Sequence, residues 1–416
     1  MGRNGGTVTA PAAGTASRYP LYLVSYFLMA IAASMAGVAM SFGVLAKTGS
    51  TALLAINLAL YFLPALLSPV SGAAVDRYGT RPVLAASIAA RVVLLAAFAA
   101  TVAWWTAPAS VAVLMTITLL VGILKLPTSP AMRKVFTRTL PADRYVKGNA
   151  HLSIAGQSGA ALSFLLVGAA IDRFDAPMVL ATAAGVFALV GVLTWPLAHA
   201  TRSPNSAATT RRLAVDTAGF VALKTSPVLL ASTAMTLATV IAFTPTEAVL
   251  PGQMQDQGHG ASGFTHFLLA YSLGVLAGGV LIGRLDDPRH FRRLVPAAAT
   301  VLVLAVAGLG LSAGIAVLLA LGLIIGACCA MLESVAMARI HQHADEAVQG
   351  RVFAALHGTE SVVRAGVLGL IAAATALGVG RLLWLAAAVP VLVLTAAAVA
   401  RPGRDRVPEG EPVEAS

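Results

Sequence analysis

Residues 52–105 read ALLAINLALYFLPALLSPVSGAAVDRYGTRPVLAASIAARVVLLAAFAATVAWW, two long apolar runs separated by the short polar segment DRYGTR. A helix needs about 20 mostly apolar residues to cross the hydrocarbon core of a bilayer. Both runs reach this length. This stretch therefore predicts two membrane-spanning helices joined by a short charged loop.

The same pattern continues along all 416 residues, of which 58% are hydrophobic and 11% charged, with a mean hydropathy of +0.84. Average soluble domains carry about 25% charged residues, so a soluble fold of this length would lack the polar surface to stay dispersed. We expect an all-α polytopic membrane protein with about twelve spans. The spans are placed at 21–45, 52–75, 82–105, 108–126, 150–171, 177–198, 227–250, 264–283, 294–313, 315–337, 353–377 and 382–400.

The net charge of +11 does not indicate a nucleic-acid partner, because the basic residues alternate with apolar spans instead of gathering on one polar surface. If the N-terminus is cytoplasmic, almost all Lys and Arg fall on the cytoplasmic side, with Lys125 counted at the edge of the fourth loop. This is the positive-inside bias. It predicts a multi-pass protein of the cell (inner) membrane with both termini in the cytoplasm. The exceptions are Lys47, Arg173 and Arg381 outside, and Arg91 and Arg364 within spans.

No pattern of an enzyme is found. The sequence has no P-loop, no His-Glu-x-x-His and no Gly-x-Ser-x-Gly motif. Cys328 and Cys329 are adjacent, which supports neither a disulfide framework nor a Cys metal site. His341 and His343 form the one histidine cluster, interpreted as part of a solvated turn. We expect no catalytic residues, no metal and no cofactor.

The longest polar connection in the middle of the chain separates six spans from six. It predicts a tail at 1–20, a six-helix bundle at 21–198, a cytoplasmic linker at 199–226, a second bundle at 227–400 and a tail at 401–416. The linker forms either a short amphipathic helix on the inner surface or a disordered connection.

A short repeat subdivides the first bundle. GAAVDRYG occupies 72–79 and GAAIDRFD occupies 168–175, three spans later. An odd number of spans places the two copies on opposite sides of the membrane, as in transporter folds built from inverted three-plus-three repeats.

The first copy, with the following Thr80 and Arg81, resembles the signature that the major facilitator superfamily carries between its second and third helices. The resemblance implies two six-helix bundles and a loop that latches the first bundle to helix eleven on the cytoplasmic side. Gly72 lets another helix approach closely, and Gly79 permits a tight turn with φ above zero. The Asp76 carboxylate can accept hydrogen bonds from an arginine or from the N-terminal end of a facing helix. A charged turn that only anchors two helices is the alternative. The implied gate residues are Gly72, Asp76, Arg77, Gly79 and Arg81.

Residues 130–141, Asn149-Ala150 and 350–352 resemble loops of the drug and siderophore efflux branch of that superfamily. The resemblance implies proton-driven efflux of a drug-like or natural-product molecule by alternating access. Two features depart from the family: the loop at 279–293 lacks the signature order, and span four lacks the Arg-Gly motif linked to proton antiport. Uptake of a small metabolite is the alternative, and a transport-dead sensor or scaffold is the alternative from another class.

Charges within spans cost about 2.5–3.5 kcal/mol each, so each is a functional candidate. Glu360 and Arg364 are spaced i, i+4, with His357 one turn earlier, so the three share a helix face and can pair internally. We favour the interpretation that these three residues and Arg351 form a cytoplasmic gate network over the interpretation that they form a substrate site. The ion-coupling candidates are Glu247 and Glu333, with an interfacial Glu that reaches water as the alternative.

In the resembled family, helices one, four, seven and ten line the central cavity. Their hydroxyl, aromatic and thioether side chains would suit a moderately apolar organic molecule, although Ser and Thr also serve ordinary helix packing in membranes. The expected partners are this substrate, a coupling ion taken to be the proton, and the lipid bilayer, for a monomeric carrier. The cavity candidates are Tyr22, Tyr26, Met29, Met115, Thr118, Ser232, Thr236 and Thr239.

Overall fold

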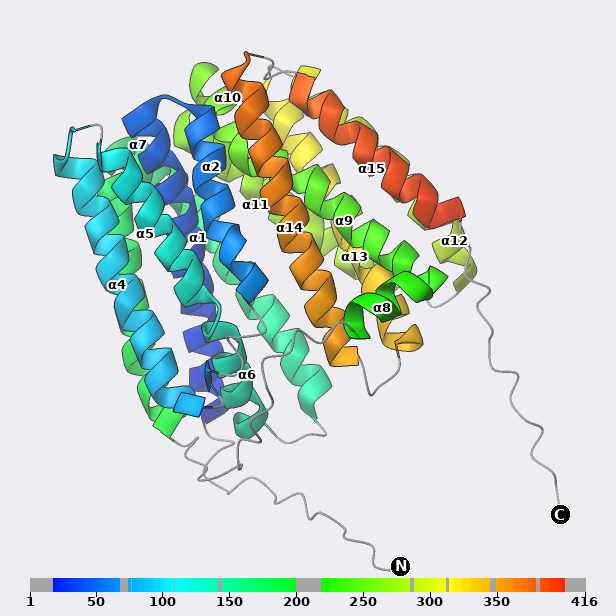
Figure 1. The fold of residues 1–416 in the computed structure, drawn as a ribbon, viewed down its shortest axis with the longest axis horizontal. Coiled ribbons are helices and arrows are strands. Elements are labelled where there is room, and N and C mark those ends of the chain that lie inside the picture. Colours follow the sequence, from blue (N-terminus) through cyan, green and yellow to red (C-terminus); the bar gives the residue numbers. More distant parts are fainter. Residues whose placement is uncertain are drawn as a thin grey trace, which may run out of the picture.

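The computed structural model describes residues 18–67, 74–75, 77–107, 109–140, 144–199, 218–284, 288–311, 314–344, 349–378 and 382–400. Every regular element within these residues is a helix (Figure 1). Two of the predicted gate residues, Gly72 and Asp76, lie outside the described residues, as do both predicted tails apart from residues 18–20.

The helices before the central linker are α1 (Tyr19–Thr48), α2 (Thr51–Phe62), the 3-10 helix η2 (Leu63–Leu67), α4 (Thr80–Trp104), α5 (Ala109–Lys125), α6 (Thr128–Thr139) and α7 (Tyr145–His199). Those after it are α8 (Ala218–Thr225), α9 (Pro227–Ala248), α10 (Leu250–Asp256), α11 (Gly260–Gly283), α12 (Pro288–Leu311), α13 (Ile315–His343), α14 (Gln349–Ala376) and α15 (Leu382–Ala400).

The predicted membrane architecture is confirmed. In the described part of the chain, nine helices are long and apolar enough to cross a membrane, and Thr51–Leu67 and Leu383–Ala397 are shorter apolar helices. One of the nine, His151–Leu197, is 47 residues long and contains two of the expected spans. The described residues of each expected span are therefore mainly helical.

The boundary between spans five and six is a bend within α7. Asp175 has φ 64° and ψ 161°, and it is the one non-glycine residue of the described chain with a positive φ. Pro177 follows two residues later and cannot donate a backbone hydrogen bond. The chain therefore reverses direction without a loop.

The fourth span is longer than the sequence suggested. Helix α6 continues α5 after a short turn, so one apolar segment runs from Ala109 to Thr139. Lys125 is the last residue of α5, and a two-residue turn separates it from α6, so much of the expected fourth loop is the helix Thr128–Thr139. The basic residues of α6 made its sequence look like a loop, although its apolar side chains Met132, Val135 and Phe136 are buried.

The helices pack as two groups. In the first, α7 lies against both α1 and α4, and in the second, α11 lies against α13 while α9 lies against α13 and α15. The groups meet where α7 contacts α11 and where α2 contacts α14 (Figure 1). We call the end at which α1 begins, near α6 and α8, the termini end, and the opposite end the far end.

The end of the predicted linker is the short helix α8, while residues 200–217 lie outside the described part. Its Leu223 is buried in a small cluster with Ile340, Val352 and Leu356. Helix α8 packs onto α14 and α9, so residues 218–225 of the predicted linker are helical.

Candidate transport cavity

Two adjoining cavities lie among the helices. The first, of about 430 Å³, is lined by α1, α4, α5, α6 and α7 together with Tyr61 of α2. The second, of about 400 Å³, is lined by helices of both groups. They share lining residues on α1, α2 and α5, among them Met40, Tyr61 and Lys125. Each has the size of a pocket for a small organic molecule.

The second cavity contains an ion pair between helices of the C-terminal group. Arg364 Nη1 of α14 lies 3.6 Å from Glu247 Oε2 of α9. The Arg364 guanidinium also lies over the ring of Phe62, 4.3 Å from its centroid, so it reaches α2 in the other group. Helix α9 remains helical through Pro245 up to Ala248. The acid is thus held on a continuous helix at the junction of the two groups.

This pair differs from the predicted internal pairing. Arg364 was expected to pair along α14 with Glu360, but it turns to Glu247 on a neighbouring helix. Glu360 instead contacts His357, whose Nδ1 lies 2.9 Å from Glu360 Oε2. Glu333 of α13 is close enough for the charges of His357 and Glu360 to act on it. The predicted network is thus divided into two clusters.

Arg351 lies at the start of α14, where its backbone carbonyl touches Gly219 of α8, so tightly that a Cβ at Gly219 would overlap it. This contact fixes α8 against the termini end of α14. Arg351 and the His357 cluster therefore lie on the same helix, two turns apart.

The predicted cavity residues fall into two sets. Tyr22, Tyr26 and Met29 line the first cavity, and Thr118 lines the second. The other four are not among the described lining residues of either cavity. The three hydroxyl groups of α9 donate to carbonyls of their own helix at 2.8–2.9 Å, which is the packing alternative: Ser232, Thr236 and Thr239. Met115 is half-buried on α5.

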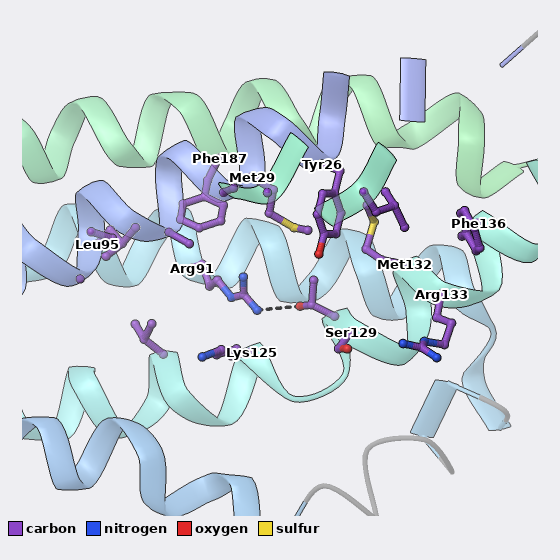
Figure 2. A pocket seen from close by; sticks show the side chains of 18 of the residues that line it. Tyr26, Met29, Arg91, Leu95, Lys125, Ser129, Met132, Arg133, Phe136 and Phe187 are labelled. Atoms are coloured by element: carbon purple, nitrogen blue, oxygen red, sulfur yellow. Dashed lines mark hydrogen bonds between the residues drawn. The ribbon is translucent and has the colours of Figure 1, made fainter. Parts of the chain in front are cut away.

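Figure 2 shows Lys125 and Arg133 on one side of the first cavity and Tyr26, Met29 and Phe187 on the other, with Arg91 between Phe187 and Lys125. Lys125 and Arg133 come from α5 and α6, while Tyr26, Met29 and Phe187 face them from α1 and α7. None of the cavity residues predicted from the sequence is charged. Arg133 belongs to the lining because the segment that carries it is the helix α6 and not a loop.

Arg91 of α4 also lines this cavity, and one of its terminal nitrogens is bound to two protein acceptors, whereas its Nε has no hydrogen-bond partner. Its Nη2 donates to the Leu124 carbonyl at 2.9 Å and to Thr128 Oγ1 at 2.6 Å. These two bonds tie α4 to the turn between α5 and α6, directly beside Lys125. Arg91 thus positions that turn.

The predicted gate loop is described in part. Gly79 has φ 87°, a conformation that residues with a Cβ rarely adopt, and it precedes the first residue of α4. The Arg81 guanidinium stacks over the ring of Trp195 on α7, 3.8 Å from its centroid, and Arg77 lies 5.4 Å from the Tyr78 ring. The described basic residues of this loop thus contact rings of their own group.

A contact at the far end was not predicted. The carboxylate of Asp172 on α7 accepts from the backbone N–H groups of Ala261 at 2.9 Å and Ser262 at 3.0 Å, and from the Ser262 hydroxyl. These N–H groups begin α11 and have no acceptor within their own helix, so a carboxylate is favoured there. Gly168, one turn earlier, has no room for a Cβ, which would lie 2.6 Å from Ser262 Cα. The two groups are therefore joined at this end.

The sequence signal for this contact was the repeat. Asp172 occupies the position in GAAIDRFD that Asp76 occupies in GAAVDRYG. We used the repeat for topology and did not give Asp172 a role.

The fold and the cavities define a class of protein: a polytopic helical membrane protein of the carrier type. In this class a cavity lies at the junction of two six-helix bundles. A profile of the Major Facilitator Superfamily matches residues 22–366. The chain belongs to this superfamily of transporters.

Solved transporter structures share the fold. The nucleoside transporter NupG is 15% identical, with a TM-score of 0.71 over 92% of this chain and 98% of that chain. A POT family transporter in complex with 5-aminolevulinic acid is 13% identical, with a TM-score of 0.72 over 91% and 95%. A bacterial homologue of the human lysosomal transporter Spinster, inward-facing and unoccupied, is 12% identical, with a TM-score of 0.72 over 94% and 97%. No curated protein matches the chain in sequence.

Proposed function

We propose that this protein is a proton-coupled secondary transporter that exports a small organic molecule by alternating access. The observation that carries the proposal is the Glu247–Arg364 pair, which lines a cavity bounded by both bundles. A charged pair inside a membrane is costly, and in membrane proteins such groups mark substrate or ion pathways.

Protonation of Glu247 is the coupling step of this proposal. The neutral acid no longer attracts Arg364, which also contacts Phe62 of the N-terminal bundle. A proton at Glu247 therefore changes the contacts of an arginine that touches both bundles. An equilibrium between two arrangements shifts only if the ligand, here the proton, interacts differently with each.

Two latches would alternate in the cycle. At the far end, Asp172 holds the start of α11. At the termini end, the matching loop that contains Gly72, Asp76, Arg77, Gly79 and Arg81 would close. Support for the second latch is the repeated sequence, since an inverted repeat places equivalent groups at opposite ends.

For orientation, we place the termini end in the cytoplasm, because most Lys and Arg belong to segments on that side. The far-end latch then closes the cavities toward the outside. Export is proposed from the resemblance of residues 130–141 and 350–352 to the efflux branch, and uptake by the same fold is the alternative to be tested. A sensor or scaffold would need no pair of latches.

Replacement of Glu247 by glutamine is expected to abolish proton movement coupled to substrate, because the amide cannot release a proton. Proteoliposomes loaded with the pH dye pyranine are given a panel of nucleosides, dipeptides and aromatic acids, and the proton flux that each compound causes is measured. In E247Q the compound-dependent flux should fall at least 10-fold, whereas substrate-for-substrate exchange without a gradient should persist.

Asp256→Asn is the matched control, since this acid lies on α10, the continuation of α9, and is exposed. It should retain the parent flux. Unchanged proton flux in E247Q would remove Glu247 as the coupling residue. Absence of any compound-dependent flux in the parent, in either direction, would favour the scaffold alternative.

A further inference from the structure

The first cavity has an excess of positive charge. Three cationic side chains line it, namely Arg91, Lys125 and Arg133, and none of its described lining residues is acidic. Glu247 is the one acidic residue among the described lining residues of the second cavity, and it is already paired with Arg364. The positive charge of the first cavity is thus not balanced by its own lining.

Two of these cations remain available to a ligand. Arg91 spends donors on Leu124 and Thr128. Lys125 lies over the rings of Tyr61 and Phe62, 4.8 and 5.7 Å from their centroids, and forms no ion pair with a described carboxylate. Lys125 and Arg133 are both exposed lining residues of the cavity, and an anion compensates a cationic side chain more strongly than a ring face does.

The opposite wall is apolar and aromatic. Tyr26, Met29 and Phe187 face Lys125 and Arg133 across the cavity (Figure 2). The Tyr22 hydroxyl is already used, because it donates to the Met132 carbonyl at 3.2 Å. Rings and thioethers that face a pair of cations suit a molecule with a flat apolar body and one acidic group.

From this arrangement we infer that the substrate is a small amphipathic organic anion, whose acidic group lies between Lys125 and Arg133 and whose apolar body lies on Tyr26, Met29 and Phe187. The inference rests on the proposed transport function and gives its substrate a chemical class. Lys125 also lines the second cavity, so the anion would lie next to the Glu247–Arg364 pair.

The charge of such a substrate also bears on direction. An inside-negative membrane potential drives an anion outward and a proton inward. Exchange of an internal anion for an external proton is therefore favoured by the potential on both counts. Uptake of the same anion would oppose the potential and would need additional protons.

The test is binding to the purified full-length protein, measured by equilibrium dialysis with three probes that share one ring system: 2-naphthoate, neutral 2-naphthamide and cationic 2-naphthylmethylammonium. We expect the anion to bind at least 10-fold more tightly than the other two. Lys125→Gln and Arg133→Gln should each weaken 2-naphthoate binding about 10-fold and leave naphthamide binding unchanged. Lys125→Arg should retain anion binding, which separates loss of charge from loss of fold.

Arg138→Gln is the control on the same helix, because Arg138 is exposed and is not a lining residue of either cavity. It should bind 2-naphthoate like the parent. Equal binding of the three probes, or no effect of both glutamine variants, would overturn the inference.

An anionic lipid offers the same chemistry as a soluble anion. The dialysis is therefore repeated in nanodiscs of phosphatidylcholine and of phosphatidylglycerol. Binding of 2-naphthoate in both supports a soluble substrate, whereas its loss in phosphatidylglycerol assigns the site to lipid and overturns the inference. Anion binding without compound-dependent proton flux would contradict the proposed function alone, and proton flux with cations or neutral compounds would contradict the inference alone.

Discussion

Replacement of Asp172 by asparagine is expected to open the far end of the molecule. The carboxylate accepts from two backbone N–H groups and one hydroxyl at the start of α11. An amide keeps one acceptor and turns an NH₂ group toward the same donors. Hydrogen bonds to charged groups contribute about 1.5–3 kcal/mol each to stability when they are shielded from water. Because this site is partly exposed, we expect a total loss of about 2 kcal/mol, or a change of about 30-fold in the closed-to-open equilibrium.

The change is measured as a distance between spin labels at the far end. Trp104 at the end of α4 and Leu311 at the end of α12 are 82% and 84% exposed and can be replaced by cysteine. The background carries Cys328→Ala and Cys329→Ala. In D172N, double electron–electron resonance should show a new population at longer distance between these labels.

Asp175→Asn is the control, since Asp175 belongs to the same octapeptide and asparagine has nearly the same size and shape as aspartate. It should keep the parent distance distribution. If D172N also kept it, Asp172 would cap α11 without acting as a latch, and the proposed alternation would lose its far-end element.

Replacement of Gly326 by alanine is expected to destabilise the C-terminal bundle strongly. An added Cβ would overlap the Tyr271 carbonyl oxygen, and the helices α11 and α13 cross at this point. Gly278 repeats the contact, since a Cβ there would lie 2.5 Å from the Ala327 carbonyl oxygen. Helices in a membrane gain stability from close packing at small residues. Separation of this pair should cost about 3 kcal/mol or more.

The measurement is the Tm of the detergent-purified protein, together with the yield of monodisperse material. Gly279→Ala is the neighbouring control, because no atom lies within 4 Å of its added Cβ. It should leave the Tm unchanged or slightly raised. A G326A variant as stable as G279A would mean that α11 and α13 can separate freely. Tyr271 stacks on Phe243 with 4.3 Å between ring centroids, so G326A should also disturb the second cavity.

The spans were predictable from sequence because a helix in a bilayer satisfies its own backbone hydrogen bonds, which makes apolar length a local signal. The family resemblance rested on one loop, and the superfamily match over residues 22–366 agrees with it. The efflux branch remains a proposal, because the similar solved structures include nucleoside, POT family and Spinster-type transporters.

Helix α6 shows where local reasoning failed. Its Arg133, Lys134 and Arg138 have the composition of a loop, and its apolar residues are buried only because α1, α4 and α7 pack around it. Composition averaged over such a segment hides an amphipathic helix. The substrate inference depends on this helix and was therefore beyond the sequence.

The ion pair was decided by packing between distant segments. The i, i+4 rule connects Arg364 with Glu360, but α9 brings Glu247 to Arg364, while Glu360 contacts His357. Likewise, Asp172 finds its donors on α11. Apolar length and charge bias are properties of single segments, and they sufficed for the class of protein, its spans and their expected orientation. The partner of each charge depends on which helix faces it across the bundle, and no local pattern contains that information.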